Sequence, residues 1–379
     1  MLAHFAHHLM TALPVPLLPF IRDDFSLDYT KSAWVNSAFS LIYGAAQIPA
    51  GWLADRIGPR FLLIIGICGT ALAGVLVGLS QNFTMLIVFM VVMGILGGGY
   101  HPAAAPMVSA SVDAKYRGRA LGFHEIGASA SFLVAPIIAA GIASAWGWRS
   151  SFIGLAIPAL ILGLIFFKFA GKPVKKVRPP REITGSYGEP ALSRGNLRRL
   201  VVFMFLSVFT GGVVGSVTAF LPLYMVDKLG ASEVSAASFY VIHASAGIWA
   251  SPMGGYLSDR LGRVPLIITS CLISAAVVFL LKLAPYGWGI GILILILGMA
   301  TFMRMPVSEA YIIGQTTERH RSMIYGIYYF SMTETGAIFA PIMGHFIDNY
   351  DFYNCFTGAS IIIAGVTLLC AFFLRGSRN

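Results

Sequence analysis

The stretch GWLADRIGPR at residues 51–60 returns almost unchanged as GYLSDRLGR at residues 255–263. Asp55 and Asp259 stand 204 residues apart, which predicts that one half of the chain is a copy of the other. Each copy places Gly, Asp and Arg in a polar turn between two apolar runs that are long enough to cross a bilayer. A polar turn in that position predicts a cytoplasmic loop of a membrane protein.

The composition excludes an ordinary soluble domain. Of the 379 residues, 57% are hydrophobic and only 11% are charged, and the mean hydropathy is +0.78. The net charge of +10 fits loops beside a membrane better than a nucleic-acid partner. Four cysteines lie in or beside apolar runs without metal-type spacing, so they are predicted to be small apolar fillers: Cys68, Cys271, Cys355 and Cys370.

Apolar runs of about 20 residues, the length that spans a hydrocarbon core, predict an all-α integral membrane protein with twelve transmembrane helices. The runs lie at roughly 1–21, 31–54, 61–80, 83–110, 119–144, 149–170, 199–226, 233–257, 264–283, 287–313, 322–347 and 352–374. The connections are short except for a basic, Pro- and Gly-containing segment. The predicted organisation is an N-terminal six-helix half at 1–170, a cytoplasmic linker at 171–198 and a C-terminal six-helix half at 199–379.

The repeat extends beyond the two loops, and the basic residues orient it. Matching residues recur at offsets of 203 to 205: Pro19 and Pro222, Pro102 and Pro306, Ala135-Pro136 and Ala340-Pro341. Most of the 26 Lys and Arg residues fall on the side of the two GxxxDR loops, which predicts that both termini are cytoplasmic in a plasma (inner) membrane. Arg304 instead lies inside a predicted span.

The first loop resembles the signature between helices 2 and 3 of the major facilitator superfamily, and its copy resembles the equivalent loop between helices 8 and 9. The resemblance implies two pseudo-symmetric six-helix halves that rock about a midplane site. It also implies a role in cytoplasmic gating for the loop residues Gly51, Asp55, Arg56, Gly58, Arg60, Gly255, Asp259, Arg260, Gly262 and Arg263.

Ionisable side chains inside predicted spans mark candidate sites, because each is costly in a bilayer. His4, His7, His8 and Thr11 share one helix face, which is predicted to point into a central cavity. His4 is interpreted mainly as a packing residue. The candidate substrate-binding residues are Arg304, His7, His8, Tyr100, His101 and His124. The candidate proton-coupling residues are Glu125, Glu309 and Glu334. Neutral histidines that fix helix packing remain the alternative at each histidine.

Arg304 is the strongest single candidate because arginine keeps its charge in any protein environment. It therefore requires a carboxylate or an anionic substrate. Glu309 lies five residues later, too far around the helix for a good pair, whereas Glu334 and Glu125 are better partners. A permanent ion pair that braces the helices is the alternative to a cation that exchanges a carboxylate for substrate.

A closer resemblance concerns His101-Pro102 and LPVPLLPF at 13–20, which are similar to the fosmidomycin-resistance branch of the superfamily. That branch implies export of a small anionic compound. Drug antiporters of the superfamily carry an Arg in helix 4, where this chain has residues 89–92 as FMVV. Their helix 5 motif is degenerate here as Ala135-Pro136 and Ala139-Ala140.

The predicted function is secondary active transport of a small, anionic organic solute by alternating access, coupled to protons. A drug or antimetabolite efflux antiporter and a His-based transition-metal carrier are the alternatives. An enzyme is not predicted, because His124-Glu125 lacks the second histidine of a zinc protease at Ala128. No cofactor and no metal are predicted, and the proton gradient is the expected driving force. The predicted partners are a small-molecule substrate and the lipid bilayer, with no nucleic acid and a monomeric chain.

Overall fold

The computed structural model describes residues 1–112, 117–169, 194–316 and 318–374, and these form helices with no strand among them. This confirms the all-α prediction. The chain divides into two compact units, which comprise Met1–Ser26 with Trp34–Tyr187, and Leu27–Ala33 with Gly188–Asn379. Among the described residues, eight helical segments are long and apolar enough to cross a membrane by length and composition. The predicted count of twelve spans is therefore only partly confirmed.

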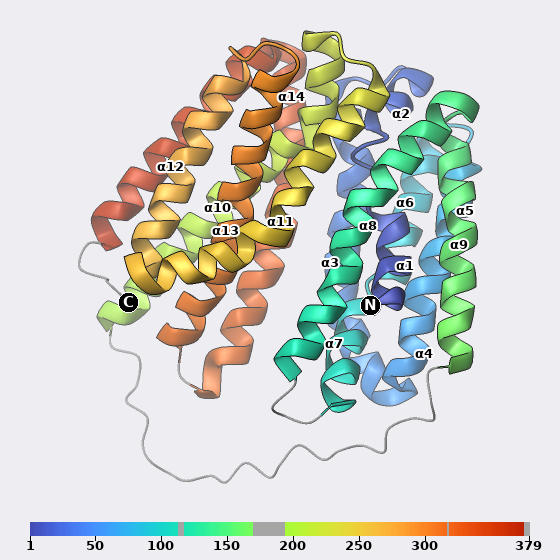
Figure 1. Cartoon of the computed structure of the whole chain (residues 1–379), viewed down its shortest axis with the longest axis horizontal. Helices are drawn as coiled ribbons and strands as arrows, with labels where there is room; N and C mark the ends of the chain where they lie inside the picture. The colour runs from blue at the N-terminus through green and yellow to red at the C-terminus, as the bar shows by residue number, and fades with distance from the viewer. Residues whose placement is uncertain (113–116, 170–193, 317, 375–379) are drawn as a thin grey trace. The chain divides into compact units, whose positions relative to one another are not determined.

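The first unit holds the N-terminal helices, which Figure 1 shows in blue to green. They are α1 (Leu2–Thr11), α2 (Leu18–Phe25), α3 (Tyr29–Ile57), α4 (Pro59–Ile64), the π-helical turn η1 (Ile65–Gly69), α5 (Thr70–Gly78), α6 (Phe83–Gly97), α7 (Tyr100–Ala110), α8 (Arg117–Trp146) and α9 (Trp148–Phe169). The short α1 packs against α8 and α9, and α5 packs against α6 and α9. This packing places the histidine face of α1 inside the unit.

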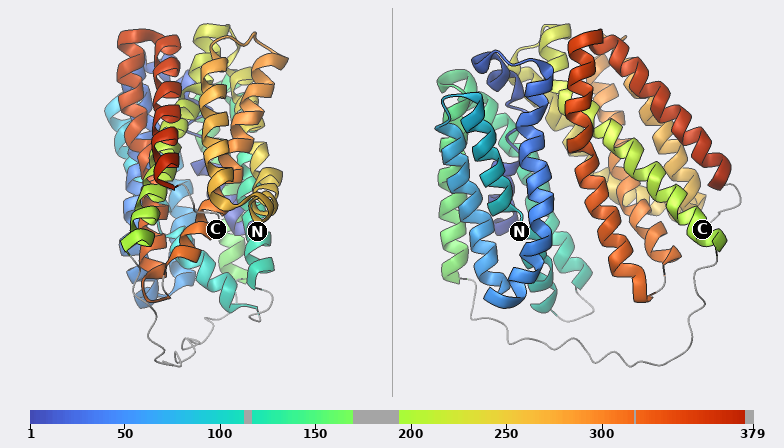
Figure 2. Two further views of the ribbon diagram at one scale, coloured as in Figure 1. Left: turned by 90° about the vertical axis from the view of Figure 1, so that its left-hand side faces the viewer. Right: turned by 180° about the vertical axis from the view of Figure 1, so that it is seen from behind.

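The second unit holds the C-terminal helices, drawn in yellow-green to red in Figure 2. They are α10 (Arg194–Leu229), α11 (Glu233–Leu261), α12 (Arg263–Leu281), α13 (Trp288–Gln315) and α14 (Glu318–Leu374). The long α14 contains both final predicted spans and bends at Asp351, whose φ is 72°. Its two arms and α10 pack together, while α11 packs against α13. Most of the predicted linker lies outside the described residues, and its last five residues begin α10.

Two predicted spans are interrupted in the structure. The span at 1–21 divides into α1 and α2, because Pro14 and Pro16 lack the amide hydrogens that a continuous helix requires. The span at 83–110 divides into α6 and α7 at Gly98 and Gly99. The second break is where α7 begins with Tyr100, so it positions one of the candidate site residues.

The two signature loops have the same backbone conformation. Gly58 has φ 92° and ψ 142°, and Gly262 has φ 90° and ψ 150°. Each glycine amide donates to the carbonyl four residues earlier, to Ala54 at 3.0 Å and to Ser258 at 2.9 Å. This backbone region is accessible essentially only to glycine. The repeat seen in the sequence is therefore a repeat of local structure.

A close helix contact also repeats between the units. A Cβ atom added to Gly94 of α6 would lie 2.7 Å from the carbonyl oxygen of Phe39 on α3. A Cβ atom added to Gly298 of α13 would lie 2.5 Å from the carbonyl oxygen of His243 on α11. Both residues of each pair are offset by 204 positions from their counterparts. These glycines allow two helix backbones to touch, as small residues commonly do between membrane helices.

Candidate functional site

The first unit gathers its candidate residues into one aromatic cluster. The α1 helix supplies His4, His7 and His8, α7 supplies Tyr100 and His101, and α8 supplies His124. The rings of His4 and His124 stack with centroids 4.1 Å apart, and those of His7 and Tyr100 stack at 4.3 Å. His4, His7 and Tyr100 are fully buried. The structure therefore brings together the candidates that helical spacing and helix order suggested.

His7 is held by hydrogen bonds on both ring nitrogens. Its Nδ1 lies 3.1 Å from the carbonyl oxygen of Gly66, which can only accept, so Nδ1 carries the proton. In the neutral ring Nε2 then accepts from the hydroxyl of Tyr43 at 3.0 Å. Gly66 lies in the π-helical turn η1, which re-aims backbone carbonyls away from the regular α-helical pattern. Both nitrogens of His7 are thus engaged within the protein.

His4 and His8 form a second hydrogen-bonded pair. The Nδ1 atom of His4 lies 3.0 Å from the carbonyl oxygen of His124, so it carries the proton and leaves Nε2 as an acceptor. The Nε2 atoms of His4 and His8 lie 3.1 Å apart, and His8 must donate this bond. The other nitrogen of His8 then accepts from the Thr11 hydroxyl at 2.8 Å. One proton is therefore shared between two facing imidazole nitrogens.

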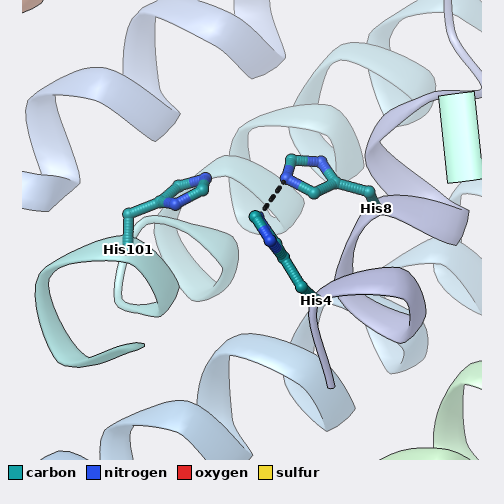
Figure 3. A group of neighbouring side chains, drawn as sticks. All are labelled: His4, His8 and His101. Atoms are coloured by element: carbon teal, nitrogen blue, oxygen red, sulfur yellow. Dashed lines mark hydrogen bonds between the residues drawn. The ribbon is translucent and has the colours of Figure 1, made fainter. Parts of the chain in front are cut away.

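Glu125 and His101 lie beside this pair. Glu125 is exposed, and its Oε1 lies 3.9 Å from Nδ1 of His4. His101 is half-buried, and its ring meets that of His4 edge-on at 5.3 Å between centroids. Figure 3 shows His4, His8 and His101 converging from two helices. Whether Glu125 carries a coupling proton remains a prediction.

At its candidate site the second unit has a buried arginine, where the first unit has a histidine cluster. Arg304 on α13 is only 2% exposed. Its Nη1 donates to Thr210 Oγ1 on α10 at 2.9 Å and lies 3.4 Å from Cys271 Sγ on α12. Gly211 leaves room for the guanidinium, because a Cβ atom there would lie 2.9 Å from Nη2. None of the ion pairs between described residues includes Arg304.

A hydrogen-bonded cluster of hydroxyl groups and two glutamates lie in the same unit as Arg304. Ser207 Oγ lies 3.1 Å from Ser308 Oγ and 2.8 Å from the hydroxyl of Tyr328. Glu334 on α14 is 5% exposed, and its Oε2 is buried without a hydrogen-bond partner in the described structure. Glu309 is half-buried on α13. The expected carboxylate partner of Arg304 is thus replaced by a hydroxyl and a thiol.

An apolar cavity of about 510 Å³ lies in the same unit between α10 and α14. Phe209, which precedes the Arg304 ligand Thr210, lines it together with Phe339, Phe346 and Ile362. A volume of this size suits a small organic ligand, and apolar walls are typical of such sites. The sequence did not suggest this cavity, because its lining comes from segments that are far apart along the chain.

The arginines of the two signature loops make two kinds of contact, one with an aromatic ring of their own helix and one with a backbone carbonyl of another helix. Arg56 lies over the ring of Trp52 at 3.8 Å, and Arg260 lies over that of Tyr256 at 4.5 Å. Their neighbours hold other helices of the same unit: Arg60 donates to the carbonyl of Phe167 at the end of α9. Arg263 donates to that of Ala310 on α13 at 2.9 Å. Gly51 and Gly255 lie within helices, and Asp259 is exposed. The side chain of Asp55 lies outside the described residues.

Several site residues were not predicted from sequence. Tyr43 and Gly66 bind His7, while Thr210 and Cys271 bind Arg304. Cys271 was expected only to fill space, yet it also serves as a hydrogen-bond acceptor. The internal repeat offered a signal for Thr210, because this residue follows His7 by the same 203 positions that separate Pro19 from Pro222.

Comparison with known proteins identifies the class. The family model of the Major Facilitator Superfamily matches residues 1–303 and 203–379. Multidrug resistance protein MdtG of Proteus mirabilis (strain HI4320) is 27% identical over 361 residues, which are 93% of this chain and 89% of that protein. The protein of the same name from Escherichia coli (strain 55989 / EAEC) is 27% identical over 379 residues, 96% of this chain and 89% of that protein.

Solved structures share the fold. A bacterial homolog of the human lysosomal transporter Spinster, in an inward-facing and occupied conformation, matches with a TM-score of 0.79 at 16% identity, covering 98% of this chain and 93% of that one. A POT family transporter in complex with 5-aminolevulinic acid matches with a TM-score of 0.81 at 13% identity, covering 98% and 94%.

The helical architecture and these matches define a multi-pass transporter that lies in a lipid bilayer and acts on a small-molecule substrate. The chain belongs to the Major Facilitator Superfamily. Its bacterial relatives and apolar helices support an inner-membrane location.

Proposed function

We propose that this transporter exports small organic solutes that carry an anionic group, such as a carboxylate or a phosphonate. The observation that carries the proposal is Arg304, a fully charged side chain that is 2% exposed and held by neutral groups. A buried cation without an anion is costly, and in membrane proteins such a group usually belongs to a substrate or ion pathway. The planar guanidinium matches a carboxylate or phosphonate through two parallel hydrogen bonds.

The neighbourhood of Arg304 supports this assignment. Thr210 and Cys271 contact Nη1, while the Nε atom is buried without a hydrogen-bond partner in the described structure. An anion that bound the guanidinium would supply the missing acceptor and the missing charge at the same time. Removing a bound anion leaves Thr210 and Cys271 in place, so the side chain keeps its position between transport cycles.

We propose that Glu334 takes up the coupling proton. It is 5% exposed, and its Oε2 is buried without a hydrogen-bond partner. Burial of a carboxylate oxygen without a hydrogen-bond partner is unfavourable, so protonation of Glu334 is linked to how far each conformation of the transporter buries it. Exchange of a proton for an anionic solute would then couple export to the proton gradient. The proposed orientation has both termini on the cytoplasmic side.

A second candidate is efflux of apolar drugs. The similar MdtG proteins are named for multidrug resistance, and the apolar cavity between α10 and α14 has about 510 Å³ for such a compound. In this case transport would depend on Phe209 and Phe339, which line the cavity, and would not require Arg304. The two candidates therefore make opposite predictions for one substitution.

Transport by the purified chain in proteoliposomes with an imposed pH gradient tests the proposal. Small carboxylates, phosphonates and cationic or neutral drugs are screened with the wild type, Arg304→Gln and Arg198→Gln. The last variant removes an exposed guanidinium and serves as the control. We expect an anion to move with the gradient, and Arg304→Gln alone to lower its transport about 100-fold. Movement of only cationic or neutral compounds, or full activity of Arg304→Gln, would overturn the anion assignment.

A further inference from the structure

Three imidazoles of the first unit converge without a carboxylate among them. One ring nitrogen from each of His4, His8 and His101 lies within 4.8 Å of the other two. His4 and His8 are buried and His101 is half-buried. Figure 3 shows that the rings point toward a common centre from α1 and α7. Such a set of neutral nitrogen donors is what borderline-soft metal ions prefer.

The hydrogen bonds already prepare two of these rings as ligands. The Nδ1 proton of His4 is fixed on the carbonyl of His124, so its Nε2 lone pair is free of a proton and faces Nε2 of His8. A metal-bound histidine typically donates its other nitrogen to a carbonyl or carboxylate in this way. Thr11 is the equivalent hydrogen-bond partner of His8, because its Oγ1 lies 2.8 Å from Nδ1.

We propose that His4, His8 and His101 form a binding site for one divalent first-row transition-metal ion of the Zn²⁺ type. Three histidine ligands with an open fourth position form a known tetrahedral arrangement for such ions. The inference rests on the first unit alone and is independent of the anion site at Arg304.

Binding requires one proton to change place. In the metal-free pair, Nε2 of His8 donates to Nε2 of His4 at 3.1 Å. When the ion takes both Nε2 lone pairs, the His8 proton transfers from Nε2 to Nδ1, where Thr11 Oγ1 accepts it. No proton is gained or lost, and both nitrogens of His8 remain satisfied. Thr11 therefore supports both forms of the pair.

The same contacts select the ligands from among the neighbouring histidines. His7 uses one nitrogen for Gly66 and the other for Tyr43, so it offers no lone pair. His4, His124 and Glu125 form another close triad, but Glu125 is exposed. That triad also lies on the Nδ1 side of His4, whose proton is already bound by the carbonyl of His124.

The donors must draw together when the ion binds. Tetrahedral Zn²⁺ with nitrogen ligands requires donor separations of about 3.3 Å. The pair of His4 and His8 already meets this at 3.1 Å, so most of the movement falls on His101. Its position at the start of α7, directly after the break at Gly98 and Gly99, places it where the helix can adjust.

Titration of the full-length chain, purified in detergent with a tag that contains no histidine, tests the site. Co²⁺ is the spectroscopic probe, Zn²⁺ is the competitor, and bound metal is counted by elemental analysis. We expect one ion per chain and the intense visible absorption of tetrahedral Co²⁺. His8→Gln and His101→Gln should each weaken binding at least about 100-fold, and Thr11→Val about 10-fold.

His243→Gln is the matched control, because His243 is a buried histidine of the second unit. It should bind as the wild type does. If the ligand variants fail to fold, Thr11→Val and the wild-type stoichiometry decide instead. The proposal is overturned if the wild type shows no saturable one-to-one binding, or if His8→Gln, His101→Gln and Thr11→Val bind as tightly as the wild type.

Discussion

The two units place different chemistry at the same positions of the internal repeat. At offsets of 203 for the first helix and 204 for the others, the equivalent pairs are His4 and Ser207, His7 and Thr210, Tyr100 and Arg304, and His124 and Tyr328. The contacts are equivalent as well. His4 stacks on His124, where Ser207 binds Tyr328. His7 stacks on Tyr100, where Thr210 binds Arg304.

This comparison shows that one backbone plan can hold either a neutral or a charged site. In the first unit, imidazole and phenol rings stack and hydrogen-bond among themselves and to backbone carbonyls. In the second unit, small hydroxyl groups make room for one guanidinium. In the first site, hydrogen bonds engage both ring nitrogens of His4, His7 and His8. The second site carries a charge that its direct partners do not neutralise. Specialisation of the two halves thus lies in side chains.

The largest effect is expected at Arg304 and separates substrate binding from structural bracing. Loss of a bidentate contact to an anion should lower transport about 100-fold in Arg304→Gln, because hydrogen bonds to charged groups contribute about 1.5–3 kcal/mol. The loss in folding stability should be only about 1 kcal/mol, since Thr210 and Cys271 are neutral. Initial transport rates and thermal unfolding in detergent measure the two effects.

Arg304→Lys provides the internal control, because it keeps the charge and loses the fork geometry. Its rate should fall between those of the wild type and Arg304→Gln. A structural ion pair predicts a different outcome. Breaking a buried pair costs about 3–5 kcal/mol, so a stability loss of that size in Arg304→Gln, without a transport defect in the folded fraction, would contradict the anion site.

The sequence predicted the two-fold plan because the plan depends on local patterns. Long apolar runs predicted the helices, and the repeated GxxxDR stretch predicted the two halves. Helical spacing also placed His4, His7 and His8 on one face, which the structure confirms. The division of the span at 1–21 was missed, although Pro14 and Pro16 both lie within it.

The partners of Arg304 were not predicted, because they are neutral residues on separate helices. Thr210 and Cys271 carry no signal in their own segments, and the need of a buried arginine for a counter-charge pointed to Glu334 and Glu125 instead. The apolar cavity between α10 and α14 likewise depends on tertiary packing. Site geometry between helices requires their relative positions, which spacing along one helix does not contain.

The next effect tests whether the two loops are equivalent in energy as well as in shape. Gly58→Ala and Gly262→Ala should each destabilise the folded protein by about 1–3 kcal/mol, because both glycines have φ near 90°. Nothing lies within 4 Å of a Cβ atom at Gly58, so the cost is conformational. Thermal unfolding in detergent should show similar shifts for the two variants.

Gly255→Ala is the control within the same motif. Gly255 lies in the helical part of the loop, and a Cβ atom there also meets nothing within 4 Å. Its stability should stay close to that of the wild type. A shift for Gly58→Ala without one for Gly262→Ala would show that the repeat is conserved in backbone shape and not in energetics.

The smallest effect concerns the aromatic ring that lies beneath an arginine in each of the two repeats. Trp52 and Tyr256 are offset by 204 residues, and each lies beneath the arginine four positions later. A cation and an aromatic ring at an exposed site contribute about 0.5–1 kcal/mol, with tryptophan the stronger partner. Trp52→Leu should therefore destabilise more than Tyr256→Leu. The double substitutions Trp52→Leu with Arg56→Gln and Tyr256→Leu with Arg260→Gln isolate each coupling. If the ring substitution destabilises the protein equally with and without the arginine, the rings act by packing alone. The arginines would then gain no stabilisation from the aromatic rings on their own helices.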